Sequence, residues 1–178
     1  MALRKANSYS KRTVVPYTRI SKRKQKSFVK TVPAQKIVKF TMGKSELEKE
    51  GKLPCKLTMI SSEKIQIRHN AMEACRQFIN KKLDKELSGQ YLFKIIPFPH
   101  HIQRENRMLT GAGADRMQTG MQLSFGKAVG KAAILQKNSR LFELYLPNDK
   151  AVKFARHVLK QIKSKLPGTT QILYNQTQ

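Results

Sequence analysis

The sequence has very few acidic residues. Only 11 of its 178 residues are Asp or Glu, against 36 Lys or Arg, which gives a formal net charge of +25 with histidine neutral. An excess this large repels itself within a compact chain and is most easily tolerated when a polyanion neutralises it. Nucleic acid is therefore the leading class of partner, with a general polyanion-binding protein as one alternative.

Cysteine and long apolar segments are also scarce. The two cysteines, Cys55 and Cys75, are too few and too far apart for a disulfide framework or a four-ligand zinc site, so we expect a reducing compartment. No segment approaches the roughly 20 apolar residues of a membrane span, and the first thirty residues lack the apolar block of a signal peptide. We therefore expect a cytoplasmic protein with no membrane partner.

Positive charge is concentrated at the start of the chain. The first 45 residues hold thirteen Lys or Arg, and Glu46 is the first carboxylate. The opening segment has too few apolar residues to offset the entropy of ordering, and its scattered aromatics suit stacking between phosphate contacts. We predict a basic RNA-binding extension over residues 1–31, with a solubilising tail as the alternative, and a single α+β domain over residues 32–178.

Two amphipathic helices are predicted, over residues 70–87 and about 148–166. Asn70 is expected to cap the first helix, with Glu73 at capping-box spacing, and Gly89 to end it. The apolar residues that recur every three or four positions and predict a core are Met72, Cys75, Ile79 and Leu83 in the first helix and Val152, Ala155, Leu159, Ile162 and Leu166 in the second.

Alternating apolar residues predict short strands around the helices. Two of these strands are expected to form a β-hairpin that turns at Asn138 and Ser139. Together the elements predict an α+β fold with a mixed sheet and two amphipathic helices. The expected strands are residues 35–41, 55–60, a segment within 91–99, the hairpin strands 131–136 and 140–146, and 170–174.

Two glycine-rich motifs do not meet the requirements of a nucleotide site. Gly111 and Gly113 resemble the start of a dinucleotide-binding fingerprint, but Arg116 stands where a third glycine would allow close helix packing. The stretch Gly120–Ala128 has one residue too many for a phosphate-binding loop and lacks the Ser or Thr that holds magnesium. We therefore expect no cofactor.

Catalytic and metal sites also have little support. Only three carboxylates lie between residues 87 and 147, too few to favour paired-carboxylate chemistry. His100 and His101 are adjacent, so on a strand they point to opposite faces, one packed inward and one at an RNA surface. His69 is expected at the surface. We expect no catalytic residue and no metal site, and an RNA-modifying enzyme is the alternative from the enzyme class.

The segment Arg104–Met121, rich in arginine and glycine, is the strongest candidate for function. Its three arginines suit forked contacts with phosphates, and its glycines and small side chains let the backbone approach a polyanion closely. Loops of this length without regular structure are usually functional or disordered. For Asp115 beside Arg116, the alternative is a structural role in pinning the loop.

The same segment resembles a known family. The block Ala114–Met121, Ala-Asp-Arg-Met-Gln-Thr-Gly-Met, followed by Phe125-Gly126-Lys127, is similar to the signature of the large-subunit ribosomal proteins called L-ten-e in archaea and eukaryotes and L-sixteen in bacteria. The segments Pro97–Met108 and Val32–Ile37 also fit this family. The resemblance extends from about Pro16 to the C-terminus.

The resemblance implies a hammerhead-type α+β fold in the large ribosomal subunit. The implied partners are large-subunit ribosomal RNA, 5S RNA and neighbouring ribosomal proteins, without homo-oligomers. The family's extended loop matches residues 101–121 and implies approach to the A-site and P-site tRNAs at the peptidyl transferase centre, where ribosomal RNA performs the chemistry. The loop residues implied to act there are Arg104, Asn106, Arg107, Gly111, Gly113, Asp115, Arg116 and Gln118.

The basic extension is expected to order on ribosomal RNA, releasing counterions as it binds. Its start, Lys5–Tyr9, departs from the family's usual Arg-Pro-x-Arg-x-Tyr pattern, so its contacts are not transferred from the family residue by residue. The cations expected to bind ribosomal RNA phosphates are Arg4, Lys5, Lys11, Arg12, Arg19, Lys22, Arg23 and Lys24.

Overall fold

A computed structural model describes residues 4–11, 15–18, 23, 29, 31–105 and 126–176. Within these residues the chain forms eight strands, three α-helices and one short 3-10 helix. In chain order the elements are β1 (Thr41–Gly43), α1 (Ser45–Lys49), β2 (Cys55–Ser61), β3 (Ile65–Arg68), α2 (His69–Leu87), β4 (Leu92–Ile95), β5 (His101–Glu105), β6 (Lys127–Leu135), β7 (Arg140–Leu146), α4 (Asp149–Ile162), η2 (Lys163–Lys165) and β8 (Thr170–Gln176).

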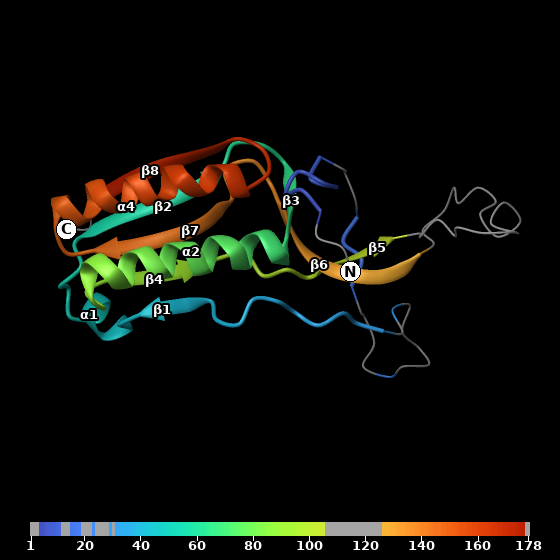
Figure 1. Ribbon diagram of the computed structural model, residues 1–178, viewed down its shortest axis with the longest axis horizontal. Helices are drawn as coiled ribbons and strands as arrows, with labels where there is room; N and C mark the ends of the chain where they lie inside the picture. Colours follow the sequence, from blue (N-terminus) through green and yellow to red (C-terminus); the bar gives the residue numbers. More distant parts are fainter. Residues whose placement is uncertain are drawn as a thin grey trace, which may run out of the picture.

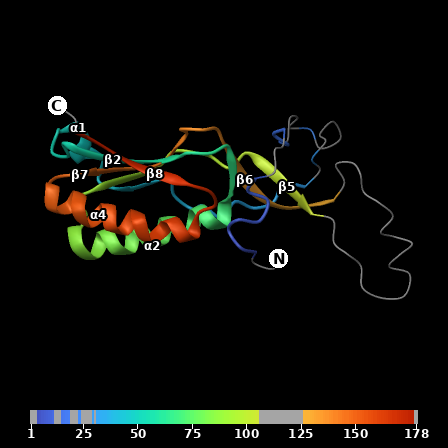
Figure 2. The ribbon, with the colours of Figure 1, turned by 90° about the horizontal axis from the view of Figure 1, so that it is seen from above.

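Two helices cover one face of a five-stranded antiparallel sheet. The strand order is β1-β4-β7-β2-β8, and α2 and α4 lie side by side over the same face, whereas the short α1 lies on the opposite side (Figures 1 and 2). The core lies between these layers. Leu57, Leu144 and Phe142 are completely buried there, and the rings of Phe93 and Phe142 meet edge to face with centroids 5.6 Å apart.

A smaller antiparallel sheet, in the order β3-β6-β5, extends from one end of the five-stranded sheet (Figure 1). Strands β2 and β7 pair in the large sheet, and their continuations β3 and β6 pair in the small one. The chain bends between β6 and β7 at Asn138, whose φ is 64° and whose backbone N–H donates to the carbonyl of Ser61 at 2.7 Å. The two sheets are therefore connected by two segments of the chain, one that contains β2 and β3 and one that contains β6 and β7.

The α+β class is confirmed, but several strand predictions are wrong. In place of a mixed sheet, the described residues form two purely antiparallel sheets. Residues 131–136 and 140–146 lie largely in strands but do not form a hairpin, because β6 and β7 belong to different sheets. The backbone at Asn138 bonds across to β2, so the chain does not fold β6 back onto β7. Of the expected strand 35–41, only Thr41 lies in β1.

Helix α2 buries its predicted apolar residues. The four residues of its stripe are completely buried, and burial raises the pKa of the Cys75 thiol to about 12, as expected for a core cysteine. The capping prediction is wrong, because the helix begins at His69, before Asn70. Glu73 bonds instead within the helix, accepting hydrogen bonds from Arg76 at 2.7 and 2.8 Å. The helix ends before Gly89, as predicted.

Helix α4 buries its predicted apolar residues as well, and its end is tighter than expected. The α-helix stops at Ile162, and the 3-10 turn η2 leads to Leu166, which is still buried. The chain then reverses at Pro167 and Gly168, where φ of the glycine is 69°, before it enters β8.

Candidate nucleic-acid interface

The small sheet fixes where the arginine- and glycine-rich segment leaves the domain. Strand β5 ends at Glu105 and β6 begins at Lys127, and these two residues are paired across the sheet. They lie at the end of the molecule remote from helix α4 (Figures 1 and 2). Seven of the eight predicted loop residues lie outside the described residues: Asn106, Arg107, Gly111, Gly113, Asp115, Arg116 and Gln118.

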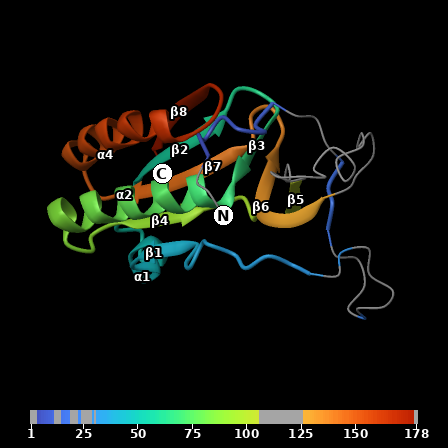
Figure 3. The same cartoon turned by 45° about the vertical axis from the view of Figure 1, so that its right-hand side comes forward.

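Two described segments of the basic extension, residues 4–11 and 15–18, lie against the small sheet (Figure 3). The backbone N–H of Ile102 donates to the carbonyl of Tyr17 at 2.8 Å. The backbone N–H of Tyr17 donates in return to Nδ1 of His101 at 3.0 Å. The extension is therefore joined by hydrogen bonds to the strand that leads into the loop.

Charges at the base of the loop are engaged by this extension. Glu105 forms an ion pair with Arg4 and accepts a hydrogen bond from the hydroxyl of Tyr9 at 3.0 Å. The guanidinium of Arg104 lies 3.7 Å from the ring centroid of Tyr17, within cation–π range. Glu105 is the only carboxylate in the three strands of the small sheet. Arg4 neutralises this carboxylate.

Two of the histidines near this sheet are buried. His101 is buried and His100 is exposed, as predicted. His69 is buried, so the prediction of a surface position is wrong. The segment that contains Lys36 lies against the ring, and the backbone N–H of Lys36 donates to Nδ1 of His69 at 3.4 Å. Burial, with nearby Arg and Lys charges, lowers the pKa of His69 to about 4, and burial with the charge of Arg104 lowers the pKa of His101.

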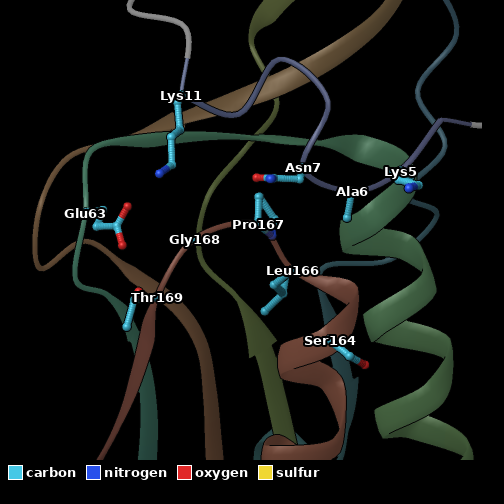
Figure 4. A pocket seen from close by; sticks show the side chains of 10 residues that line it. All are labelled: Lys5, Ala6, Asn7, Lys11, Glu63, Ser164, Leu166, Pro167, Gly168 and Thr169. Carbon is cyan, nitrogen blue, oxygen red and sulfur yellow. The ribbon is translucent and has the colours of Figure 1, made fainter.

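The structure brings together two of the cations predicted in the extension. Lys5 and Lys11 line a cavity of about 640 Å³ together with Glu63 and residues from the turn after α4 (Figure 4). Arg4 is paired with Glu105, and Arg23 is exposed. The other predicted cations of the extension lie outside the described residues: Arg12, Arg19, Lys22 and Lys24.

Sequence reasoning missed a basic surface on α4 and η2. After Asp149 the chain contains no Asp or Glu, and cations recur every three or four residues opposite the apolar stripe. This pattern predicts the surface, but it was assigned only to an amphipathic helix. The exposed cations there are Lys150, Lys153, Arg156, Lys160, Lys163 and Lys165.

Cations on the face of the large sheet opposite α2 and α4 are paired instead. Glu143 is 3% exposed and binds Lys56 at 3.0 Å and Arg140 at 2.9 Å. Burial acts to raise the pKa of Glu143, but the hydrogen bonds and charges of these two cations hold it below its usual value. Lys94 pairs with Glu48 of α1 at 2.7 Å. Lys56 and Lys94 both lie over the ring of Tyr145, with their Nζ atoms 5.0 and 4.8 Å from the ring centroid, respectively.

Neither a metal site nor a membrane span is found in the part of the chain that the structure describes. No group of three or more His, Cys, Asp or Glu side chains there could hold a metal ion. No helix in that part is long and apolar enough to cross a membrane. Cys55 and Cys75 are both buried as free thiols.

The chain is similar to ribosomal proteins along nearly its whole length. A sequence model of the family described as "Ribosomal protein L16p/L10e" matches residues 16–173. The large ribosomal subunit protein uL16 of Methanospirillum hungatei is 39% identical over 178 residues, covering 99% of this chain and 98% of that protein. The protein of the same name from Sulfolobus acidocaldarius is 40% identical over 174 residues, covering 97% of this chain and 93% of that protein. The protein of the same name from Methanococcus maripaludis is 40% identical over 179 residues, covering 100% of this chain and 97% of that protein.

Proposed function

The chain belongs to the ribosomal protein L16p/L10e family, and from this premise we propose that it binds large-subunit ribosomal RNA close to 5S ribosomal RNA and extends residues 101–121 toward the A-site and P-site tRNAs. As a member of this family it is a structural protein of the large ribosomal subunit, where it serves translation, and it is not an enzyme. Ribosomal RNA and other ribosomal proteins are accordingly its partners.

The observation that carries the finer proposal is the position of the loop base. Residues Glu105 and Lys127 are paired at the end of the small sheet, far from the layer formed by α2 and α4. A loop that starts and ends there can reach past the domain while the domain itself is held on RNA. The hydrogen-bonded strands β5 and β6 give this loop a defined point of departure.

The second support is the charge at that end of the molecule. The extension is hydrogen-bonded to β5, and its Arg4 is paired with Glu105 at the base of the loop. Burial lowers the pKa values of His69 and His101, so Lys and Arg side chains are the main source of positive charge there.

Within the loop, each residue type has a role that follows from its chemistry. Arg104 is held on the ring of Tyr17 and orients the start of the loop. Arg107 and Arg116 supply forked donors for phosphates, and Gly111 and Gly113 permit close approach of the backbone to RNA. Asn106, Asp115 and Gln118 supply further polar groups for nucleotides or for the loop itself.

Removal of the loop tip tests this proposal. Deletion of Gly111–Arg116 in the full chain is expected to leave incorporation into large subunits intact, measured by sedimentation, and to slow peptide elongation by those subunits. A control replaces the same six residues with a Gly-Ser linker, which keeps the length and removes the charges. Normal elongation by subunits that carry the deletion contradicts the proposed role of the loop.

Competition separates this function from general polyanion binding. At matched salt, a fragment of large-subunit ribosomal RNA from the region near 5S RNA is expected to displace the chain from duplex DNA, because a ribosomal protein recognises the shape of its RNA as well as its charge. Equal competition by RNA and DNA favours a protein that binds polyanions without selection.

A further inference from the structure

We propose that the outer surface of α4 and η2 is a docking track for the phosphate backbone of an RNA duplex. The track is the row Lys153, Arg156, Lys160 and Lys163, called here the α4 ridge. This inference rests on the proposed function, because it assigns a surface, outside the loop and the extension, to the same ribosomal RNA partner.

The helix geometry places these cations on one face. Positions three and four residues apart lie on the same side of an α-helix, and the steps along the α4 ridge are three, four and three. The opposite side is occupied by the buried stripe that includes Val152, Leu159 and Ile162. All four cations are exposed. The ridge therefore faces outward along two to three helical turns.

The ridge cations have no acidic partner within the described residues. In the described part of the chain, none of the four forms an ion pair, whereas Lys56, Lys94 and Arg140 of the large sheet are all paired with glutamates. Cations three and four residues apart on a helix repel one another. An external row of phosphates supplies the missing negative charge.

The ridge leads toward the cations of the basic extension. The cavity lined by Lys5 and Lys11 lies at the turn after η2, between Ser164 and Thr169, so its cations continue the basic surface beyond the helix (Figure 4). Among the described residues that line this cavity, Glu63 is the one carboxylate. The extension therefore brings Lys5 and Lys11 to the turn next to the end of the ridge, although the two segments are far apart in sequence.

The composition of this surface favours duplex RNA over single strands. Single-stranded RNA is bound by stacking of bases on exposed aromatic rings, and none of the exposed large apolar side chains of the described residues lies on α4. Phe154 is half-buried against the core, and the ring of Phe78 on α2 is covered by Lys82 and Lys165, at 6.0 and 5.6 Å. The ridge therefore offers Lys and Arg side chains for phosphate contacts but no exposed ring for stacking, which suits the phosphate backbone of a duplex.

A matched pair of charge variants tests the track. The first changes Lys153, Arg156 and Lys160 to Gln, and the control changes Lys81, Lys82 and Lys85 of α2 to Gln, so both lose three positive charges. The control lysines are exposed but share their helix turns with Asp84 and Glu86. Each full-length variant is titrated with a 20-base-pair RNA duplex between 50 and 200 mM salt, after circular dichroism has verified its fold.

The ridge variant is expected to lose salt dependence and the control to keep it. Each lost phosphate contact reduces the slope of log affinity against log salt by about 0.9, so between 50 and 200 mM the wild-type chain should lose about 40-fold more affinity than the ridge variant. Equal slopes for the two variants contradict the proposal, because the duplex then senses only net charge. A preference of the wild-type chain for single-stranded RNA over the duplex also contradicts it.

The outcome for wild-type protein separates this inference from the proposed function. If the wild-type chain binds the ribosomal RNA fragment but the ridge variant binds it equally well, only the ridge assignment is wrong. If the wild-type chain binds neither the ribosomal RNA fragment nor the duplex, the proposed function itself is contradicted.

Discussion

Two basic surfaces of the same domain use their cations in different ways. On the face of the large sheet opposite the helices, Lys56 and Arg140 share Glu143, and Lys94 is paired with Glu48. On the α4 ridge none of the four cations forms an ion pair among the described residues. The position of a few glutamates therefore decides whether a cation stabilises the fold or is left for a polyanion.

Burial of Glu143 explains why the ion pairs on the large sheet are needed for stability. Glu143 is almost fully buried, and a buried carboxylate without a cation is strongly destabilising. The ridge cations are exposed and remain solvated, so they cost the fold little when unpaired. This difference between the two surfaces leads to four predictions.

Removal of both cations from Glu143 is expected to have the largest effect on stability. The double variant Lys56→Met and Arg140→Met leaves the carboxylate buried and unpaired and should lower the free energy of unfolding by about 3 kcal/mol, measured in urea. Adding Glu143→Leu to this variant should restore most of the loss, because the uncompensated charge is then gone. A further loss in the triple variant contradicts this explanation.

The pH dependence of stability should report the same glutamate. The pKa of Glu143 is lowered in the folded chain, so its stabilising contribution is complete above the ordinary value of 4.5 and is lost as pH falls through the folded pKa. Thermal unfolding between pH 6 and pH 3 should therefore depend less on pH in Glu143→Gln than in the wild-type chain. Identical pH profiles would show that the pair does not act as described.

A paired cation should become a binding cation when its acid is removed. In Glu105→Gln, Arg4 loses its carboxylate partner, and the slope of log RNA affinity against log salt should steepen by about 0.9. Between 50 and 200 mM salt this corresponds to an extra loss of about 3.5-fold in affinity. The matched control is Glu50→Gln, which frees Lys52 on the other side of the domain and should leave the slope nearly unchanged.

The smallest effect is expected when ridge cations are replaced and the free energy of unfolding is measured. Replacing Lys153, Arg156 and Lys160 with Gln should change the free energy of unfolding by less than about 0.5 kcal/mol, because the three side chains are exposed and make no ion pair in the described structure. A loss as large as that expected for the Glu143 pair would mean that the ridge serves the fold.

The sequence predicted the helices better than the sheets, for a physical reason. The apolar stripe around Cys75 is a local pattern, and burial of that stripe needs no knowledge of distant partners. Strand pairing is not local: residues 131–136 and 140–146 look like a hairpin, but their hydrogen bonds go to two different sheets. All four residues of β3, Ile-Gln-Ile-Arg, are buried, so this strand lacks the polar, exposed face that makes a strand easy to recognise.

The candidate site was predicted in part. The resemblance identified the family and the loop from the block Ala114–Met121, but the pairing of Glu105 with Arg4, about one hundred residues apart, depends on tertiary structure. The ridge on α4 was visible as a row of cations in the sequence. It could be distinguished from a face of paired charges only when the structure showed that its four cations form no ion pair among the described residues.

Lysine footprinting of assembled large subunits tests the central claim most directly. Reactivity of each lysine toward an amine-specific reagent is compared between the free chain and the subunit, with Lys81, Lys82 and Lys85 as controls on α2. We predict strong protection of Lys153, Lys160 and Lys163 in the subunit, and loss of that protection after the RNA is digested. Equal reactivity of these three lysines in the subunit and in the free chain would contradict it.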